Sequence, residues 1–185
     1  TAPDPSGGNT VRNTYIHGFG IVYKDAAGIF LGHGRDTLIE DNEISLGYYS
    51  GIVVGTLNRH RWQGQIPGTT QSAQWPQNTE RTRIERNNVH HVLLRLVDGG
   101  GIYAMGSHPD PGDAIASTMS QNYVHDIVLN PYLNYQSHTA GFYWDKGSDG
   151  WEVTRNFVEK CRHLYKFSTL ALEVEGAARG RILRE

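Results

Sequence analysis

The stretch Ile84-Glu85-Arg86-Asn87-Asn88-Val89-His90 belongs to a set of five related segments, and its pattern decides the fold. Two of its apolar residues lie five positions apart, with Asn87 between them. In a straight strand, residues five apart point to opposite faces, so both can enter one core only if the chain bends between them. We interpret Asn87 as the bend, because Asn tolerates the left-handed conformation and its amide can pair with an equivalent Asn.

Aligning the five segments gives two apolar columns and a column of Asn between them. The first apolar column is Val11, Ile39, Ile84, Met119 and Val153, the second is Ile16, Ile44, Val89, Val124 and Val158, and the Asn column is Asn42, Asn87, Asn122 and Asn156. Thr14 takes the Asn position in the first copy, and a third strand follows at Gly28, Gly51, Gly101 and Gly141. This repetition predicts an all-β, right-handed parallel β-helix, a single solenoid of about five coils with an Asn ladder at one corner.

The repeat interval is uneven, which disfavours leucine-rich and ankyrin arrays but suits a β-helix whose loops vary in length. An antiparallel sandwich or barrel is the alternative fold. We assign residues 1–10 to an N-terminal extension, 11–165 to the β-helix domain and 166–185 to an atypical tail, because the pattern fades after Cys161. Five coils of about 4.8 Å would leave strand edges open at both ends, so we expect a fragment of a longer β-helix.

Composition limits the classes of partner. The chain has 185 residues, 38% of them hydrophobic and 19% charged, which fits one folded domain. A net charge of −2 argues against nucleic acid, and no apolar run is long enough for membrane insertion. The single cysteine, Cys161, excludes an intramolecular disulfide and a multi-cysteine metal site. The oligomeric state is not indicated.

Three runs resemble a known family. They are Asp98-Gly99-Gly100-Gly101-Ile102-Tyr103-Ala104-Met105-Gly106, Asn122-Tyr123-Val124-His125-Asp126 and Ala140-Gly141-Phe142-Tyr143-Trp144-Asp145-Lys146-Gly147-Ser148. Together, over roughly residues 35–160, they resemble bacterial β-helix proteins of glycoside hydrolase family 141, in the pectate-lyase-like superfamily. Known members of that family act on plant cell-wall glycans as α-L-fucosidase or xylanase.

The resemblance implies a pair of catalytic acids on neighbouring coils, which by motif fall on Asp98 and Asp145. It also implies a polysaccharide substrate, no cofactor, and a secreted, periplasmic or cell-surface location. Strand alternation agrees in outline, because it places Tyr103, Tyr143 and Asp145 on the outer face if Ile102 points inward. We therefore expect the two tyrosines to form an exposed, stacked platform for a sugar ring.

The two acids suit glycoside hydrolysis, which needs one carboxylic acid and one carboxylate. The alternative is ordinary turn chemistry, because Asp before Gly-Gly and the run around Asp145 are also common in turns. His90 and His125 share a column with His17, which indicates either structural stacking or hydrogen bonds to sugar. The histidines are not spaced as a zinc site, so we expect no metal.

Further candidates for substrate binding lie in or beside loops. Trp62 lies in the long connection 56–79, and Lys146 directly follows Asp145. Two other function classes stay open. One is a non-catalytic glycan-binding, adhesin or tailspike-like β-helix. The other is a polysaccharide lyase or uronate epimerase, for which Lys146, Arg59 and Arg61 are the candidate bases.

Overall fold

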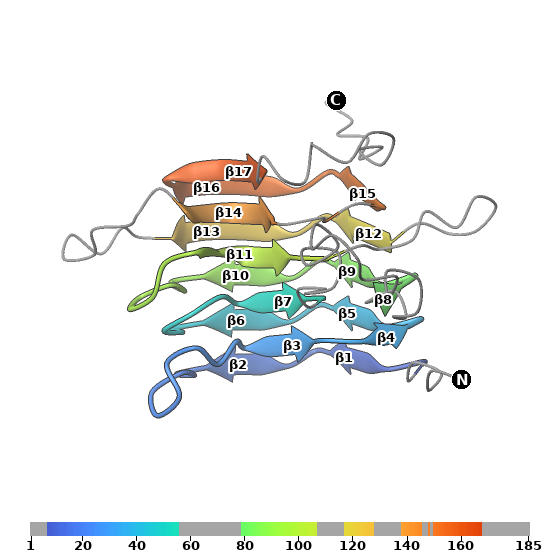
Figure 1. Cartoon of the computed structure of the whole chain (residues 1–185), viewed down its shortest axis with the longest axis horizontal. Coiled ribbons are helices and arrows are strands. Elements are labelled where there is room, and N and C mark those ends of the chain that lie inside the picture. The colour runs from blue at the N-terminus through green and yellow to red at the C-terminus, as the bar shows by residue number, and fades with distance from the viewer. Residues whose placement is uncertain are drawn as a thin grey trace, which may run out of the picture.

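The computed structural model describes residues 7–55, 79–106, 117–127, 138–145, 148 and 150–167. The strands of this described part form three parallel sheets of five strands each, together with a two-stranded sheet. Figure 1 shows five coils stacked along one axis, with the first coil at one end and the fifth at the other. The predicted parallel β-helix is therefore confirmed. Among the described residues there is no helix long and apolar enough to cross a membrane.

Each coil contributes one strand to each of the three large sheets. Sheet 1 contains β1 (Thr10–Arg12), β5 (Leu38–Glu40), β9 (Arg83–Glu85), β12 (Ser117–Ser120) and β15 (Trp151–Thr154). Sheet 2 contains β2 (Tyr15–His17), β6 (Glu43–Ser45), β10 (Asn88–His90), β13 (Tyr123–Ile127) and β16 (Phe157–Cys161). Sheet 3 contains β3 (Ile29–Leu31), β7 (Ile52–Val54), β11 (Gly99–Ala104), β14 (Thr139–Trp144) and β17 (His163–Phe167). The small sheet pairs β4 (Gly34–Arg35) with β8 (Thr79–Glu80).

The predicted apolar columns pair in register across the coils. Sheet 1 pairs Val11 with Ile39, Ile39 with Ile84, Ile84 with Met119, and Met119 with Val153. Sheet 2 pairs Ile16 with Ile44, Ile44 with Val89, Val89 with Val124, and Val124 with Val158. The members in the middle coils are fully buried, whereas Val11, Ile16 and Val158 in the end coils are only half-buried. These columns form the core inside the coils.

Shortening one side chain of this core should lower the stability of the protein. Ile84 has no exposed surface, so Ile84→Ala removes buried methyl groups and leaves a cavity. We expect the free energy of unfolding to fall by about 2 to 4 kcal/mol, measured by urea denaturation. Ile21→Ala is the matched control, because Ile21 is 64% exposed and should change little. Equal losses in both variants would contradict the assigned core.

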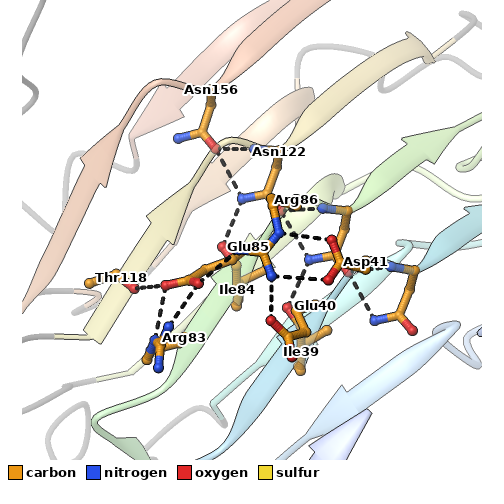
Figure 2. Close-up of polar contacts among 12 residues, drawn as sticks. Ile39, Glu40, Asp41, Arg83, Ile84, Glu85, Arg86, Thr118, Asn122 and Asn156 are labelled. Atoms are coloured by element: carbon orange, nitrogen blue, oxygen red, sulfur yellow. Dashed lines mark hydrogen bonds and ion pairs between the residues drawn. The ribbon is translucent and has the colours of Figure 1, made fainter. Parts of the chain in front are cut away.

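An Asn ladder joins the coils at the corner between sheets 1 and 2 (Figure 2). The Nδ2 group of Asn87 donates to Oδ1 of Asn122 at 3.0 Å and to the Ile39 carbonyl oxygen at 2.9 Å. The backbone amide of Asn87 donates to the same Oδ1 at 3.0 Å. Asn42 and Asn122 repeat this arrangement with their own neighbours. The predicted ladder is thus confirmed, and it satisfies polar groups that the corner would otherwise bury unpaired.

The left-handed residue of this corner is not the Asn, and our interpretation of Asn87 as the bend was wrong. The residue before each ladder position has positive φ: 51° at Asn13, 55° at Asp41, 53° at Arg86, 56° at Gln121 and 55° at Arg155. The physical reason is that the Asn amide must point into the corner to reach the next coil. The preceding residue makes the turn, with its own side chain exposed.

Glycines stand at or just before the start of several strands of sheet 3, where this sheet lies against side chains of sheet 2. A Cβ on Gly101 would lie 2.4 Å from Cγ1 of Val124, and a Cβ on Gly141 would lie 2.5 Å from Cγ1 of Val158. Both distances are too short for any side chain, so these two positions require glycine. β17 continues sheet 3 by pairing with β14, although its sequence begins without glycine. This explains why the sequence pattern fades after Cys161 while the coil does not.

A charged cluster lies outside the corner between the second and third coils (Figure 2). Arg86 forms a two-pronged ion pair with Asp41, with Nε to Oδ1 at 2.8 Å and Nη2 to Oδ2 at 3.0 Å. It also contacts Glu40 and Glu85. Hydrogen bonds from Arg86 hold the pKa of Asp41 below its ordinary value, and Arg83 does the same for the pKa of Glu85. The cluster links coils that are 45 residues apart in sequence.

The contribution of this cluster should depend on pH. A carboxylate with a lowered pKa stabilises the fold above its ordinary pKa, near 4, and loses this effect as the pH falls through the lowered value. We expect Arg86→Met to lower the urea midpoint at pH 7, and we expect its difference from the wild type to shrink as the pH falls below about 4. Arg155→Met is the control, because Arg155 occupies the same corner position and makes no ion pair with a described residue. A pH-independent difference for Arg86→Met would contradict the electrostatic explanation.

Candidate active site on the outer face of sheet 3

The outer face of sheet 3 carries a second apolar cluster, separate from the core inside the coils. Tyr103 and Tyr143 pair across β11 and β14, and their rings stack with centroids 5.0 Å apart and an interplanar angle of 26°. Val53 and Ala140 pack with them, and Tyr49 lies at the edge of the cluster. The predicted stacking of the two tyrosines on this face is confirmed.

The predicted exposure of these tyrosines was wrong. Tyr103 is 4% exposed and Tyr143 is 2% exposed, so neither offers an open ring face to a sugar. The cause is the packing of other side chains around them, which include Tyr49 and Met105. Strand alternation places a side chain outside the coil, but it does not determine whether other groups cover it. The outer face is therefore a packed layer with polar groups around it.

Asp145 lies at the end of β14, on the side of this outer cluster. Its backbone amide donates to the Ala104 carbonyl oxygen at 2.9 Å, which keeps Asp145 beside β11. Its Oδ2 accepts a hydrogen bond of 2.7 Å from the Tyr103 hydroxyl. Only 5% of Asp145 is exposed. The residue is buried, but against the outer tyrosines and not inside the coil.

Asp98 lies directly before β11 and has a left-handed backbone, with φ of 62°. Its side chain is 62% exposed, and its Oδ1 lies 3.4 Å from Nδ1 of His138. Its backbone carbonyl accepts a hydrogen bond of 2.9 Å from the Tyr49 hydroxyl. Gly99 pairs with Thr139, so Asp98 and His138 lie at equivalent positions on neighbouring coils. The two predicted acids therefore differ sharply in their solvent contact.

The negative charges of Asp98 and Asp145 influence the same three tyrosines. Burial is the largest cause that raises the pKa of Tyr49 to about 12, and it raises the pKa of Tyr103 and of Tyr143 still further. The negative charges of Asp98 and Asp145 both add to the increase at each of these three phenols. Two hydrogen bonds agree with this, because the Tyr103 hydroxyl donates to Asp145 and the Tyr49 hydroxyl donates to the Asp98 carbonyl oxygen. All three phenols stay protonated at neutral pH and can act as donors.

A lysine completes the group. Lys166 on β17 pairs with Tyr143, and its Nζ lies 5.2 Å from the centre of the Tyr143 ring. Burial lowers the pKa of Lys166, while the charges of Asp98 and Asp145 act in the opposite direction. The cluster thus combines two carboxylates, three phenols and one amine. We call Asp98, Asp145, Tyr49, Tyr103, Tyr143 and Lys166 the sheet 3 cluster.

The sequence analysis did not predict three residues of this region. Tyr49 and His138 precede strands of sheet 3 in coils next to that of Asp98, and this equivalence becomes visible once the coils are aligned. Lys166 occupies the column of Tyr103 and Tyr143, but it lies in a coil where Leu164 stands at the position equivalent to Gly141. Extending the strand alignment from Tyr143 into the next coil would have identified Lys166.

The histidine column lies elsewhere, on sheet 2. His90 and His125 stack with ring centroids 4.9 Å apart. His125 contacts Asp126 at 2.7 Å and Asn88 at 2.9 Å, and His90 contacts His91 at 2.8 Å. These contacts favour structural stacking over binding of sugar. Neither histidine lies on the strands that carry the sheet 3 cluster.

Two predicted binding residues, Trp62 and Lys146, lie outside the described residues. Within the described ranges, no group of three or more His, Cys, Asp and Glu side chains could hold a metal ion.

Comparison with known proteins agrees with this fold. The chain is similar to a solved structure described as a glycoside hydrolase, with a TM-score of 0.70 and 26% sequence identity. The similarity covers 89% of this chain and 24% of that protein, so this chain spans about a quarter of its length. No protein-family model and no curated protein sequence matches the chain. The chain therefore has a glycoside hydrolase-like fold, and membership of family 141 in particular stays a prediction.

Proposed function

We propose that this chain forms part of the catalytic domain of a glycoside hydrolase that acts on plant or cell-surface polysaccharide. The observation that carries the proposal is that tyrosines of one cluster contact both acids on neighbouring coils: the Tyr103 hydroxyl donates to Oδ2 of Asp145, and the Tyr49 hydroxyl donates to the Asp98 carbonyl oxygen. The similarity to a glycoside hydrolase supports the same reaction class. A polysaccharide substrate would place the protein outside the cytoplasm, as a secreted, periplasmic or cell-surface protein.

The proposed chemistry is two-carboxylate hydrolysis. One acid donates a proton to the glycosidic oxygen as the bond to the anomeric carbon breaks. The other, as a carboxylate, either bonds to the anomeric carbon or takes a proton from the attacking water. Tyr103 donates its hydroxyl proton to Asp145, and Tyr49 donates its own to the Asp98 carbonyl oxygen, so these phenols would position the two acids. The buried ring stack argues against a binding module that presents an open aromatic platform.

A polysaccharide lyase is the second candidate, and Lys166 is the observation that favours it. Burial lowers the pKa of this lysine, and its position over the Tyr143 ring, at the edge of the sheet 3 cluster, suits proton abstraction. A lyase breaks the sugar linkage by elimination, so it adds no water to the products and leaves a carbon–carbon double bond. The masses of the products separate the two reactions.

The test is to incubate the chain with a panel of plant polysaccharides and aryl glycosides and to analyse the products by mass spectrometry. We expect new reducing ends and products that have gained one water for each bond broken. Products with an ultraviolet-absorbing double bond and no added water would establish the lyase instead. Binding to glycans with no cleavage of any substrate would contradict both enzymatic functions.

A further inference from the structure

We infer that the two acids of the sheet 3 cluster have different roles, an inference that rests on the proposed hydrolase function. Asp145, held by the Tyr103 hydroxyl, is the carboxylate that acts at the anomeric carbon. Asp98, beside His138, is the acid that protonates the leaving oxygen. Tyr103 is a positioning residue, because it acts through Asp145.

The surroundings of Asp145 suit the carboxylate that acts at the anomeric carbon. The Tyr103 hydroxyl donates to Oδ2 of Asp145 at 2.7 Å, and Asp145 is buried against the outer tyrosines. The bond to Tyr103 and the backbone bond to Ala104 also hold Asp145 in one place, as a reacting carboxylate requires.

The surroundings of Asp98 suit the proton donor. After each turnover a general acid must recover a proton, and this recovery needs contact with solvent or with another titratable group. The Asp98 side chain is 62% exposed, whereas Asp145 as a whole is 5% exposed. Nδ1 of His138 lies 3.4 Å from Oδ1 of Asp98, within reach of a proton exchange through a small movement. The difference in exposure therefore separates the two roles.

The proposed step moves one proton and breaks one glycosidic bond. The Asp98 carboxyl gives its proton to the glycosidic oxygen, which leaves as an alcohol with the electron pair of the broken bond. The Asp145 carboxylate either forms a bond to the anomeric carbon or takes one proton from a water whose oxygen forms that bond. In the first case a water later displaces Asp145 and returns a proton to Asp98. In the second case Asp145 releases its proton to solvent and Asp98 regains one.

The roles can be tested with leaving groups of different acidity. A dinitrophenolate leaves without protonation, whereas a phenolate or a sugar needs the acid. We expect Asp98→Ala to keep kcat/KM for a dinitrophenyl glycoside within about 10-fold of wild type and to lose about 1,000-fold for the phenyl glycoside. Asp145→Ala should lose about 1,000-fold or more with both substrates. The reverse pattern, or the same pattern in both variants, would overturn the assignment.

A test of Tyr103 as a positioning residue must measure a property that the loss of a purely structural residue would not change. Tyr103→Phe removes the hydroxyl and keeps the ring stack, so Oδ2 of Asp145 loses its donor. We expect kcat/KM to fall by about 10-fold with the dinitrophenyl glycoside and with the phenyl glycoside alike, which is the pattern of a residue that acts through Asp145. Tyr165→Phe is the matched control, because Tyr165 lies on the same sheet and stacks on Phe142 inside the coil. No loss in Tyr103→Phe, or a loss confined to the phenyl glycoside, would overturn the positioning role.

Failure of the inference can be told apart from failure of the proposed function. If the wild-type chain hydrolyses no glycoside of the panel, the proposed hydrolase function itself is wrong. If the wild-type chain hydrolyses glycosides and Asp98→Ala is impaired equally on both leaving groups, the proposed function stands and only the assignment of roles is wrong. Circular dichroism of each variant shows whether the fold is retained, so a misfolded variant is not read as a catalytic effect.

Discussion

Asp98→Asn and Asp145→Asn should each lower hydrolysis of a glycan or a phenyl glycoside by about 1,000-fold or more. Each change removes proton transfer or carboxylate chemistry while it keeps the volume of the side chain. An Asn at position 145 still offers Oδ1 to the Tyr103 hydroxyl, so the contact between β14 and β11 is kept. We expect the free energy of unfolding to change by less than about 1 kcal/mol in either variant.

The measurement is kcat/KM for each variant beside its urea unfolding curve. Glu152→Gln is the control for loss of an acid without loss of catalysis, because Glu152 is exposed on β15 of sheet 1. Wild-type turnover in both Asp variants would remove the two-carboxylate mechanism. A large loss of stability at Asp145, with activity proportional to the folded fraction, would indicate a structural carboxylate instead.

Asn122→Ala should cause a larger loss of stability than a change at the end of the ladder. It removes the acceptor of the Asn87 amide and of the Asn87 Nδ2 group, and it removes the donor to the Ile84 carbonyl oxygen. All three groups belong to residues that are at most 1% exposed. A buried polar group left without a partner costs about 1 to 3 kcal/mol, so we expect a total loss of about 3 to 5 kcal/mol.

Urea denaturation of Asn122→Ala and of two further variants tests this expectation. Asn156→Ala should cost less, because Asn156 is only half-buried at the end of the ladder. Asn9→Ala is the control, because Asn9 is exposed and lies outside the ladder column. If Asn122→Ala is no more destabilising than Asn9→Ala, the ladder does not stabilise the corner.

The site was only partly predictable. The glycine run after Asp98 and the strand that ends at Asp145 identified two acids on neighbouring coils. The same pattern could not identify Tyr49, His138 or Lys166, because each becomes a neighbour only through stacking of the coils. Exposure of the tyrosines was predicted wrongly for the same reason. Alternation along one strand says which way a ring points and nothing about what packs over it.

The sequence by itself determined the coil. Apolar residues at a spacing of five, with Asn87 and its equivalents between them, could be buried together only by a repeated bend, and the repeats could satisfy the Asn amides only by stacking in parallel. Only the tertiary structure decided which residue makes the bend and which side chains meet on the outer face. Those features depend on contacts between segments 34 to 45 residues apart. Local sequence sets the direction of a side chain, but its burial and its electrostatic partners come from the coil above and the coil below.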